Sequence, residues 1–168
     1  MRILVIAAFA AIAGCTGCIS KDNTMQESQA PAQTENSEIK SGGPVRYLVV
    51  GMEYSKRFGS CLGCEIDARR MDSLLSNVFG YNGEMLISSQ ATKGEVVSKL
   101  IDGIAKTPED GMFIFCYSGH GGQEYLGGKE PDGAEKQDEY LCLYDTYLQD
   151  DEIWDIVSRC KGRVFLYF

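Results

Sequence analysis

Short apolar runs recur along residues 44–168, and longer segments with apolar side chains at helical spacing separate them. Runs of this length predict β-strands that are buried on both faces. The predicted strands are residues 46–51, 84–88, 112–117 and 163–168, with a shorter extended piece at 140–144. Strands and helices therefore alternate along this part of the chain.

Three helices are predicted between the strands. The first covers residues 64–79 and ends at Gly80, and its apolar stripe consists of Ile66, Met71, Leu74, Leu75 and Val78. Thr92 and Glu95 form a capping box that begins the second helix. Its apolar face consists of Val96, Val97, Leu100, Ile101 and Ile104. The third helix begins at residues 150–152, whose acidic side chains suit a helix N-terminus.

This alternation predicts an α/β fold with a mainly parallel sheet and helices on both of its faces. In such folds the functional groups gather at the carboxyl ends of the strands. We therefore expect the site in the loops that follow Gly51, Tyr117 and Phe168.

The first residues have the composition of a targeting segment. Arg2 supplies a positive charge, and residues 3–12 form an apolar run that is short for a membrane span. Small residues before Cys15 resemble a bacterial lipobox, in which the cysteine is lipidated. The alternative is an ordinary secretory signal that is cut near Ala13 or Gly17.

The composition divides the chain into three parts. We expect residues 1–15 to be a lipoprotein-type signal peptide, residues 16–43 a flexible polar linker, and residues 44–168 the folded domain. Lipid chains contribute about 0.8 kcal/mol per buried methylene. The expected location is therefore a lipid-anchored, exported protein on the extracytoplasmic face of a membrane.

The net charge and the cysteine content bear on nucleic-acid binding and on disulfide formation. The net charge of −8 argues against nucleic-acid binding, because phosphates would repel such a surface. Seven cysteines in an exported chain permit disulfides, but their pairing cannot be deduced from the sequence. Cys116 lies within a predicted strand and is expected in the core.

His120 is the only histidine, and it follows the predicted strand 112–117 directly. A histidine at the end of a buried strand can act as a general base or polarise a thiol. Gly121 lies next to it, and its N–H group is a candidate donor to an oxyanion. The alternative is a loop histidine among turn glycines.

Residues 115–121 (FCYSGHG) resemble the histidine motif of metacaspases and other caspase-like cysteine peptidases. Further segments of that family resemble residues 63–68, 132–133, 138–139 and 150–152, in the same order. The resemblance covers roughly residues 44–168. It implies a caspase-like fold and a cysteine-type endopeptidase that uses a Cys–His dyad containing His120.

The nucleophile that this resemblance implies is a cysteine just after the next strand. Caspase-type sequences place it about 50 residues after the histidine, which from His120 is just past Phe168. None of the seven cysteines fits, since Cys142 is expected in a loop or edge strand and Cys160 at a helix end. We therefore expect a chain that is truncated before its nucleophile and is inactive as it stands.

The resemblance also implies substrate-binding roles. Metacaspase-like enzymes cleave after Arg or Lys through an acidic pocket, which falls here on Asp67, lined by Cys64 and Ser118. A carboxylate in a partly dry pocket forms strong charge-assisted hydrogen bonds with a cation. The alternative for Asp67 is a helix acid in the first turn.

No cofactor is expected to be required, but several metacaspases bind calcium. The candidate ligands are Asp138, Asp150 and Asp151, because hard carboxylate oxygens suit calcium. The alternative is that Asp150 and Asp151 cap the third helix.

Four other functions compete with the peptidase. Cys61 and Cys64 form a C-x-x-C motif, which would suit an exported thioredoxin-like oxidoreductase or half of a zinc site. The segment 120–122 has the His-Gly-Gly pattern of a lipase oxyanion motif, without the Gly-x-Ser-x-Gly that lipases need. A caspase-like domain without its cysteine could also be a binding module for basic peptides.

Overall fold

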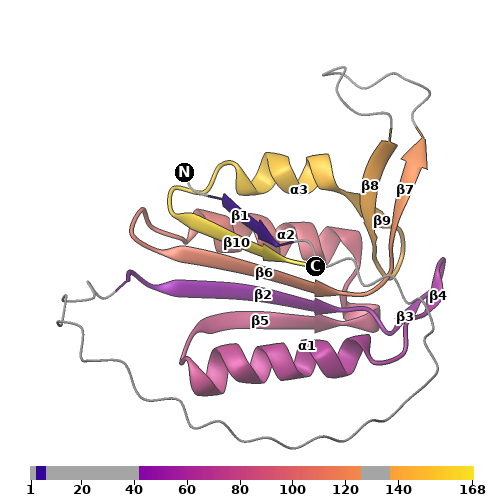
Figure 1. Cartoon of the computed structure of the whole chain (residues 1–168), viewed down its shortest axis with the longest axis horizontal. Helices are drawn as coiled ribbons and strands as arrows, with labels where there is room; N and C mark the ends of the chain where they lie inside the picture. Colours follow the sequence, from indigo (N-terminus) through magenta and orange to yellow (C-terminus); the bar gives the residue numbers. More distant parts are fainter. Residues whose placement is uncertain (1–2, 7–41, 126–136) are drawn as a thin grey trace, which may run out of the picture.

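Five parallel strands form the main sheet of the computed structural model, which describes residues 3–6, 42–125 and 137–168. Their order across the sheet is β1-β10-β6-β2-β5, and each neighbouring pair is parallel (Figure 1). The strands are β1 (Ile3–Ile6), β2 (Val45–Gly51), β5 (Asn82–Ile87), β6 (Met112–Ser118) and β10 (Arg163–Tyr167). The predicted parallel α/β sheet is confirmed.

Helices cover both faces of this sheet, as predicted. Helix α1 (Cys64–Ser73) continues into a π-helical turn (Leu74–Val78) and packs on one face. Helices α2 (Lys93–Ala105) and α3 (Asp150–Val157) pack on the other (Figure 1). Thr92 caps α2 as expected, because its Oγ1 accepts a hydrogen bond from the Glu95 N–H at 3.3 Å. A short 3₁₀ turn, Ser88–Gln90, follows β5.

The core has two parts, because successive side chains of a strand point to opposite faces. Leu48 and Val50 of β2 belong to the cluster under α2 and α3. Tyr47 and Val49 belong to the smaller cluster under α1. Cys116 of β6 is buried in that smaller cluster, as the sequence predicts.

The apolar stripe predicted for the first helix is wrong in part. Ile66 and Val78 are 53% and 70% exposed, whereas Cys64 and Ala68 are buried. The reason is a close approach between α1 and β2, since a Cβ on Gly51 would lie 2.5 Å from the Cβ of Ala68. Small side chains therefore face β2 at the start of α1, whereas Met71 and Leu75 pack in the cluster further along.

Two small antiparallel sheets stand at the carboxyl end of the main sheet (Figure 1). One pairs β3 (Tyr54–Ser55) with β4 (Gly59–Ser60). The other has the order β7-β8-β9 and consists of β7 (Gly121–Tyr125), β8 (Gln137–Cys142) and β9 (Tyr147–Gln149). Only β8 was foreseen, as the extended piece near residue 140.

The N-terminal segment is described only at Ile3–Ile6, which forms β1 beside β10. Cys15, the expected lipidation site, lies outside the described residues, as do Asp132, Gly133 and all of the linker predicted at 16–43 except residues 42–43. Within the described ranges, no helix combines the length and apolar character needed to cross a membrane. The signal peptide and the lipid anchor remain predictions.

Candidate active site at the carboxyl edge of the sheet

His120 lies where β6 gives way to β7, at the carboxyl edge of the main sheet. Its side chain is exposed, and its Nε2 is 2.9 Å from the carbonyl oxygen of Ser60 in β4. A carbonyl oxygen only accepts hydrogen bonds, so this contact assigns the proton to Nε2. The neutral ring then presents Nδ1 as its proton acceptor.

The buried hydroxyl of Tyr117 contacts the backbone of the histidine loop, residues 119–121. Its hydroxyl is 2.8 Å from the carbonyl oxygen of His120 and 2.7 Å from that of Cys142, to which it donates. The Cys142 N–H also donates to the His120 carbonyl, at 2.9 Å. A Cβ on Gly119 would overlap the Tyr117 hydroxyl, so only glycine fits there. This role of Tyr117 was not predicted from the sequence, although a tyrosine in a buried strand usually finds a hydrogen-bond partner for its hydroxyl.

The predicted pocket residues Cys64 and Ser118 lie on either side of Gly51. Ser118 pairs with Gly51 across the β2–β6 ladder, and the Cys64 carbonyl oxygen is 3.0 Å from the position of a Cβ on Gly51. Asp67 is exposed one turn further along α1. Since side chains three positions apart share a helix face, Asp67 and Cys64 lie on one side of α1.

Gly121, the predicted oxyanion donor, is the first residue of β7. It is exposed and pairs with Leu141 in the β7–β8 ladder. Gly121 thus lies next to His120 at the edge of the sheet. Its role as a donor to an oxyanion stays a prediction.

The structure brings together two of the three predicted calcium ligands. Asp138 is buried and accepts a hydrogen bond from the Gln149 side chain. Burial, followed by a hydrogen bond with Asp138, raises the pKa of Asp150. Asp151 is exposed in the first turn of α3. Among the described residues, no group of three or more carboxylate, thiol or imidazole side chains converges as a metal site.

The cysteines of the described ranges are cross-linked or buried. Cys61 and Cys64 form a disulfide, whereas Cys116, Cys142 and Cys160 are buried free thiols. Burial raises the pKa of Cys116 to about 12 and that of Cys142 to about 11. Because the thiolate is the nucleophile, both are poorly suited to attack a peptide. The hydrogen bond that joins the Cys142 backbone to the His120 loop was not foreseen.

Strand β10 runs toward His120. It lies parallel to β6, as predicted, with Tyr167 opposite Cys116. The ring of Phe168 packs edge-on against Phe115, with ring centroids 5.9 Å apart. The carboxyl ends of β6 and β10 therefore meet at one edge of the sheet.

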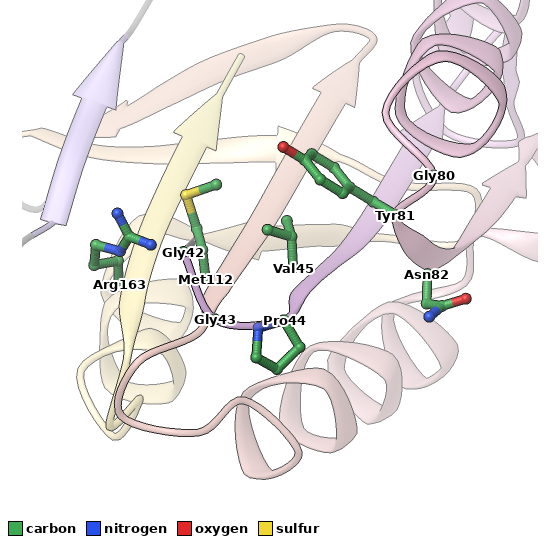
Figure 2. Close-up of a pocket in the computed structure, with 9 residues that line it drawn as sticks. All are labelled: Gly42, Gly43, Pro44, Val45, Gly80, Tyr81, Asn82, Met112 and Arg163. Atoms are coloured by element: carbon green, nitrogen blue, oxygen red, sulfur yellow. The ribbon is translucent and has the colours of Figure 1, made fainter. Parts of the chain in front are cut away.

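A hollow of about 490 Å³ lies at the opposite, amino end of the strands (Figure 2). Pro44 and Val45 of the β2 entry, Met112 of β6 and Arg163 of β10 line it, together with Tyr81 before β5. It contains none of the predicted site residues. Its position separates it from the chemistry around His120.

Comparison with known proteins identifies relatives of this arrangement. The family described as "Metacaspase, peptidase C14 domain" matches residues 46–167. Metacaspase-1B of Neurospora crassa is 32% identical over 146 residues, which are 77% of this chain and 33% of that protein. Metacaspase-1 of Ajellomyces capsulatus is 32% identical over 133 residues, which are 70% of this chain and 36% of that protein. The chain thus spans about a third of the length of these curated relatives.

A solved structure has a similar fold. A crystal structure of a protein from Geobacter sulfurreducens superposes with a TM-score of 0.65 and 27% sequence identity. The match covers 73% of this chain and 48% of that one.

Proposed function

The chain belongs to the metacaspases, the peptidase C14 family, and from that premise we propose that it contributes the histidine half of a cysteine endopeptidase that cleaves after Arg or Lys. The observation that carries this proposal is the position and hydrogen bonding of the His120 ring. Its Nε2 is engaged by the Ser60 carbonyl, so that Nδ1 is free to take a proton at the edge where β6 and β10 end.

The nucleophile is proposed to be a cysteine that follows β10 in the whole protein. The β10–β6 register supports this position, since Tyr167 lies opposite Cys116 and the next positions would lie opposite Tyr117 and Ser118. Such a residue would be close to His120. The buried free thiols of the described chain and the cross-linked pair Cys61–Cys64 leave this role to a further cysteine.

The proposed reaction uses His120 twice. Its Nδ1 takes the proton of the thiol, and the sulfur attacks the carbonyl carbon of the scissile peptide. The Gly121 N–H, at the start of β7, is the candidate donor to the oxyanion, a contribution of about 3 kcal/mol for one such donor. Nδ1 then gives the proton to the leaving amine, and water hydrolyses the thioester in the second half of the cycle.

Asp67 is proposed to select the basic side chain of the substrate. Its exposed carboxylate lies on the side of α1 that carries Cys64, next to Gly51 and Ser118 at the sheet edge. A carboxylate and a guanidinium form a bidentate, charge-assisted pair, which favours Arg strongly over neutral side chains.

Calcium and a membrane are proposed as further partners. Asp138 and Asp150 share a hydrogen bond, and a divalent cation between them would replace the proton that such a pair retains. Two converging carboxylates are fewer than calcium usually takes, so Asp151 and water would complete the set. The lipid anchor at Cys15 would hold the domain at the extracytoplasmic face of a membrane.

A second function is a binding module for basic peptides. The burial of Cys116, Cys142 and Cys160 favours it for the 168-residue chain taken alone, because Asp67 can bind a cation without any nucleophile. The two functions differ in turnover, which only the peptidase shows.

The test is a pair of variants in the full-length protein. His120→Ala should lower kcat at least about 100-fold, the lower range for acid–base catalysis. Asp67→Asn should leave turnover of neutral peptides unchanged and reduce the preference for Arg and Lys. Near-normal turnover by a folded His120→Ala variant would end the dyad assignment.

A further inference from the structure

Cys61 and Cys64 form a disulfide next in sequence to Ser60, which contacts His120, and the proposed peptidase chemistry does not use this disulfide. Their Cα atoms are 6.0 Å apart, within the usual range of about 4.4–6.8 Å for a bridged pair. Cys61 directly follows Ser60, whose carbonyl oxygen contacts His120 Nε2 at 2.9 Å. The cross-link is therefore one residue away from the group that orients the histidine.

Besides the disulfide, the two-residue pairing of β4 with β3 holds this segment, with Ser60 opposite Tyr54. Gly59 and Ser60 are exposed, and Leu62 is 87% exposed. The backbone bonds at Cys61 and Cys64 are Cys61 N–H to the Glu53 carbonyl at 2.8 Å and Cys64 N–H to the Cys61 carbonyl at 3.3 Å. Segments with so little buried surface open at a low free-energy cost. The position of the Ser60 carbonyl should therefore depend on the cross-link.

We propose that Cys61 and Cys64 form a thiol–disulfide exchange site whose oxidation state determines how firmly Ser60 holds His120. The two cysteines differ in a way that suits exchange. Cys61 is half-buried and precedes the helix, whereas Cys64 is buried as the first residue of α1. An external thiolate would attack the more accessible Cys61, and a thiolate left on Cys64 would be stabilised by the helix N-terminus.

The exchange balances with a dithiol as the reductant. One thiolate of the dithiol attacks Cys61 Sγ, the bond to Cys64 Sγ breaks, and Cys64 leaves with the electron pair. The second thiolate of the dithiol then attacks the first sulfur of the same dithiol, which is bonded to Cys61 Sγ, and Cys61 leaves as a thiolate. The pair gains two electrons and two protons, and the dithiol becomes a cyclic disulfide.

The two redox states differ at His120. In the disulfide form the Ser60 carbonyl fixes the proton on Nε2 and leaves Nδ1 as the acceptor. In the dithiol form residues 59–63 are freer, so the ring samples both tautomers. The importance of this difference for catalysis rests on the proposed function, in which Nδ1 is the base.

The experiment uses the single histidine as a reporter in the intact 168-residue chain. Two-bond ¹H–¹⁵N correlation spectra distinguish the tautomers, at about pH 8.5 where an ordinary imidazole is neutral. We expect dithiothreitol to raise the ratio of the Nδ1–H to the Nε2–H tautomer about fivefold, the worth of one net hydrogen bond. Far-UV circular dichroism verifies that the reduced chain remains folded.

Two variants control the measurement. Cys61→Ser should show the reduced spectrum with or without dithiothreitol, and Cys160→Ala, which removes a buried thiol outside the pair, should keep the wild-type response. The proposal is overturned if the wild-type tautomer ratio does not respond, or if the response persists in Cys61→Ser. It is also overturned if mass spectrometry finds Cys61 and Cys64 as free thiols in excess glutathione disulfide.

These outcomes are separate from the peptidase proposal. If the tautomer ratio responds to reduction but the His120→Ala variant keeps its turnover, the exchange site is supported and the peptidase proposal is refuted. An unresponsive tautomer in an active peptidase would do the reverse.

Discussion

Replacing Tyr117 with phenylalanine removes one hydroxyl from beneath the histidine loop and leaves the ring in place. That hydroxyl is buried and lies 2.8 and 2.7 Å from the carbonyl oxygens of His120 and Cys142. Burial raises the pKa of the Tyr117 phenol, so the hydroxyl remains a donor at every pH at which the protein is studied. The variant therefore tests a single donor.

The expected cost follows from what the variant leaves behind. The His120 carbonyl keeps the Cys142 N–H as a donor, whereas the Cys142 carbonyl, in a residue that is 4% exposed, loses the tyrosine. A buried acceptor left without its partner costs about 1–3 kcal/mol. For a domain of this size that corresponds to a fall in Tm of roughly 3–10 °C.

Calorimetry and hydrogen exchange measure the two parts of this effect. The Cys142 amide, which donates to the His120 carbonyl, should exchange roughly 5–150 times faster if the loop itself opens more often. Tyr47→Phe is the matched control. Its hydroxyl donates to the Asp72 carboxylate at 2.7 Å, and Tyr47 packs in the cluster under α1. The control should leave exchange at Cys142 unchanged.

An unchanged Tm together with unchanged exchange at Cys142 in Tyr117→Phe would refute the reasoning. In that case the Tyr117 hydroxyl would be incidental to the position of His120. A fall in Tm without faster local exchange would mean that the hydroxyl stabilises the core and not the loop.

Three further predictions concern the rest of the chain. Burial raises the pKa of Cys116 from 9.0 to about 12, so the stability that the buried neutral thiol contributes is complete below about pH 9 and is lost as the pH rises toward 12. Between these pH values, the urea midpoint should fall less steeply in Cys116→Ala than in the wild type. Equal slopes would contradict the raised pKa. The 168-residue chain should show no amidase activity on Arg or Lys peptides, whereas turnover abolished by Cys142→Ser would make that residue the nucleophile. Cys15→Ser should abolish a lipid mass increment and release the protein from membranes, and unchanged fractionation and mass would remove the anchor.

The sheet was predictable because its signal is carried by many residues at once. Continuous apolar runs such as those of β6 and β10 identify strands covered on both faces, and their parallel pairing brings His120 to the carboxyl edge. The stripe of the first helix was predicted wrongly at Ile66 because spacing alone does not reveal a close approach. Gly51, which permits that approach, is on another element.

The features of the site that were not predicted from the sequence have backbone groups and short elements in common. Ser60 acts through a backbone carbonyl, which every residue possesses, so no side-chain pattern marks it. The short strands β3 and β4 that carry it have two residues each, below the length at which periodicity is visible. The pairing of Cys61 with Cys64 was one of several open alternatives, because spacing leaves cysteine connectivity undetermined.

Strand β10 is the last strand along the described chain, and it enters the sheet between β6 and β1. Strands β2, β5 and β6 precede it, and β10 meets β6 across roughly fifty residues of intervening chain. Because the entropy of closing such a loop is lost before the pairing is gained, we expect β10 to dock late in folding. During synthesis it leaves the ribosome after the rest of the sheet. The edge of the sheet beside His120 is therefore completed only when β10 pairs with β6, after the other described strands have been synthesised.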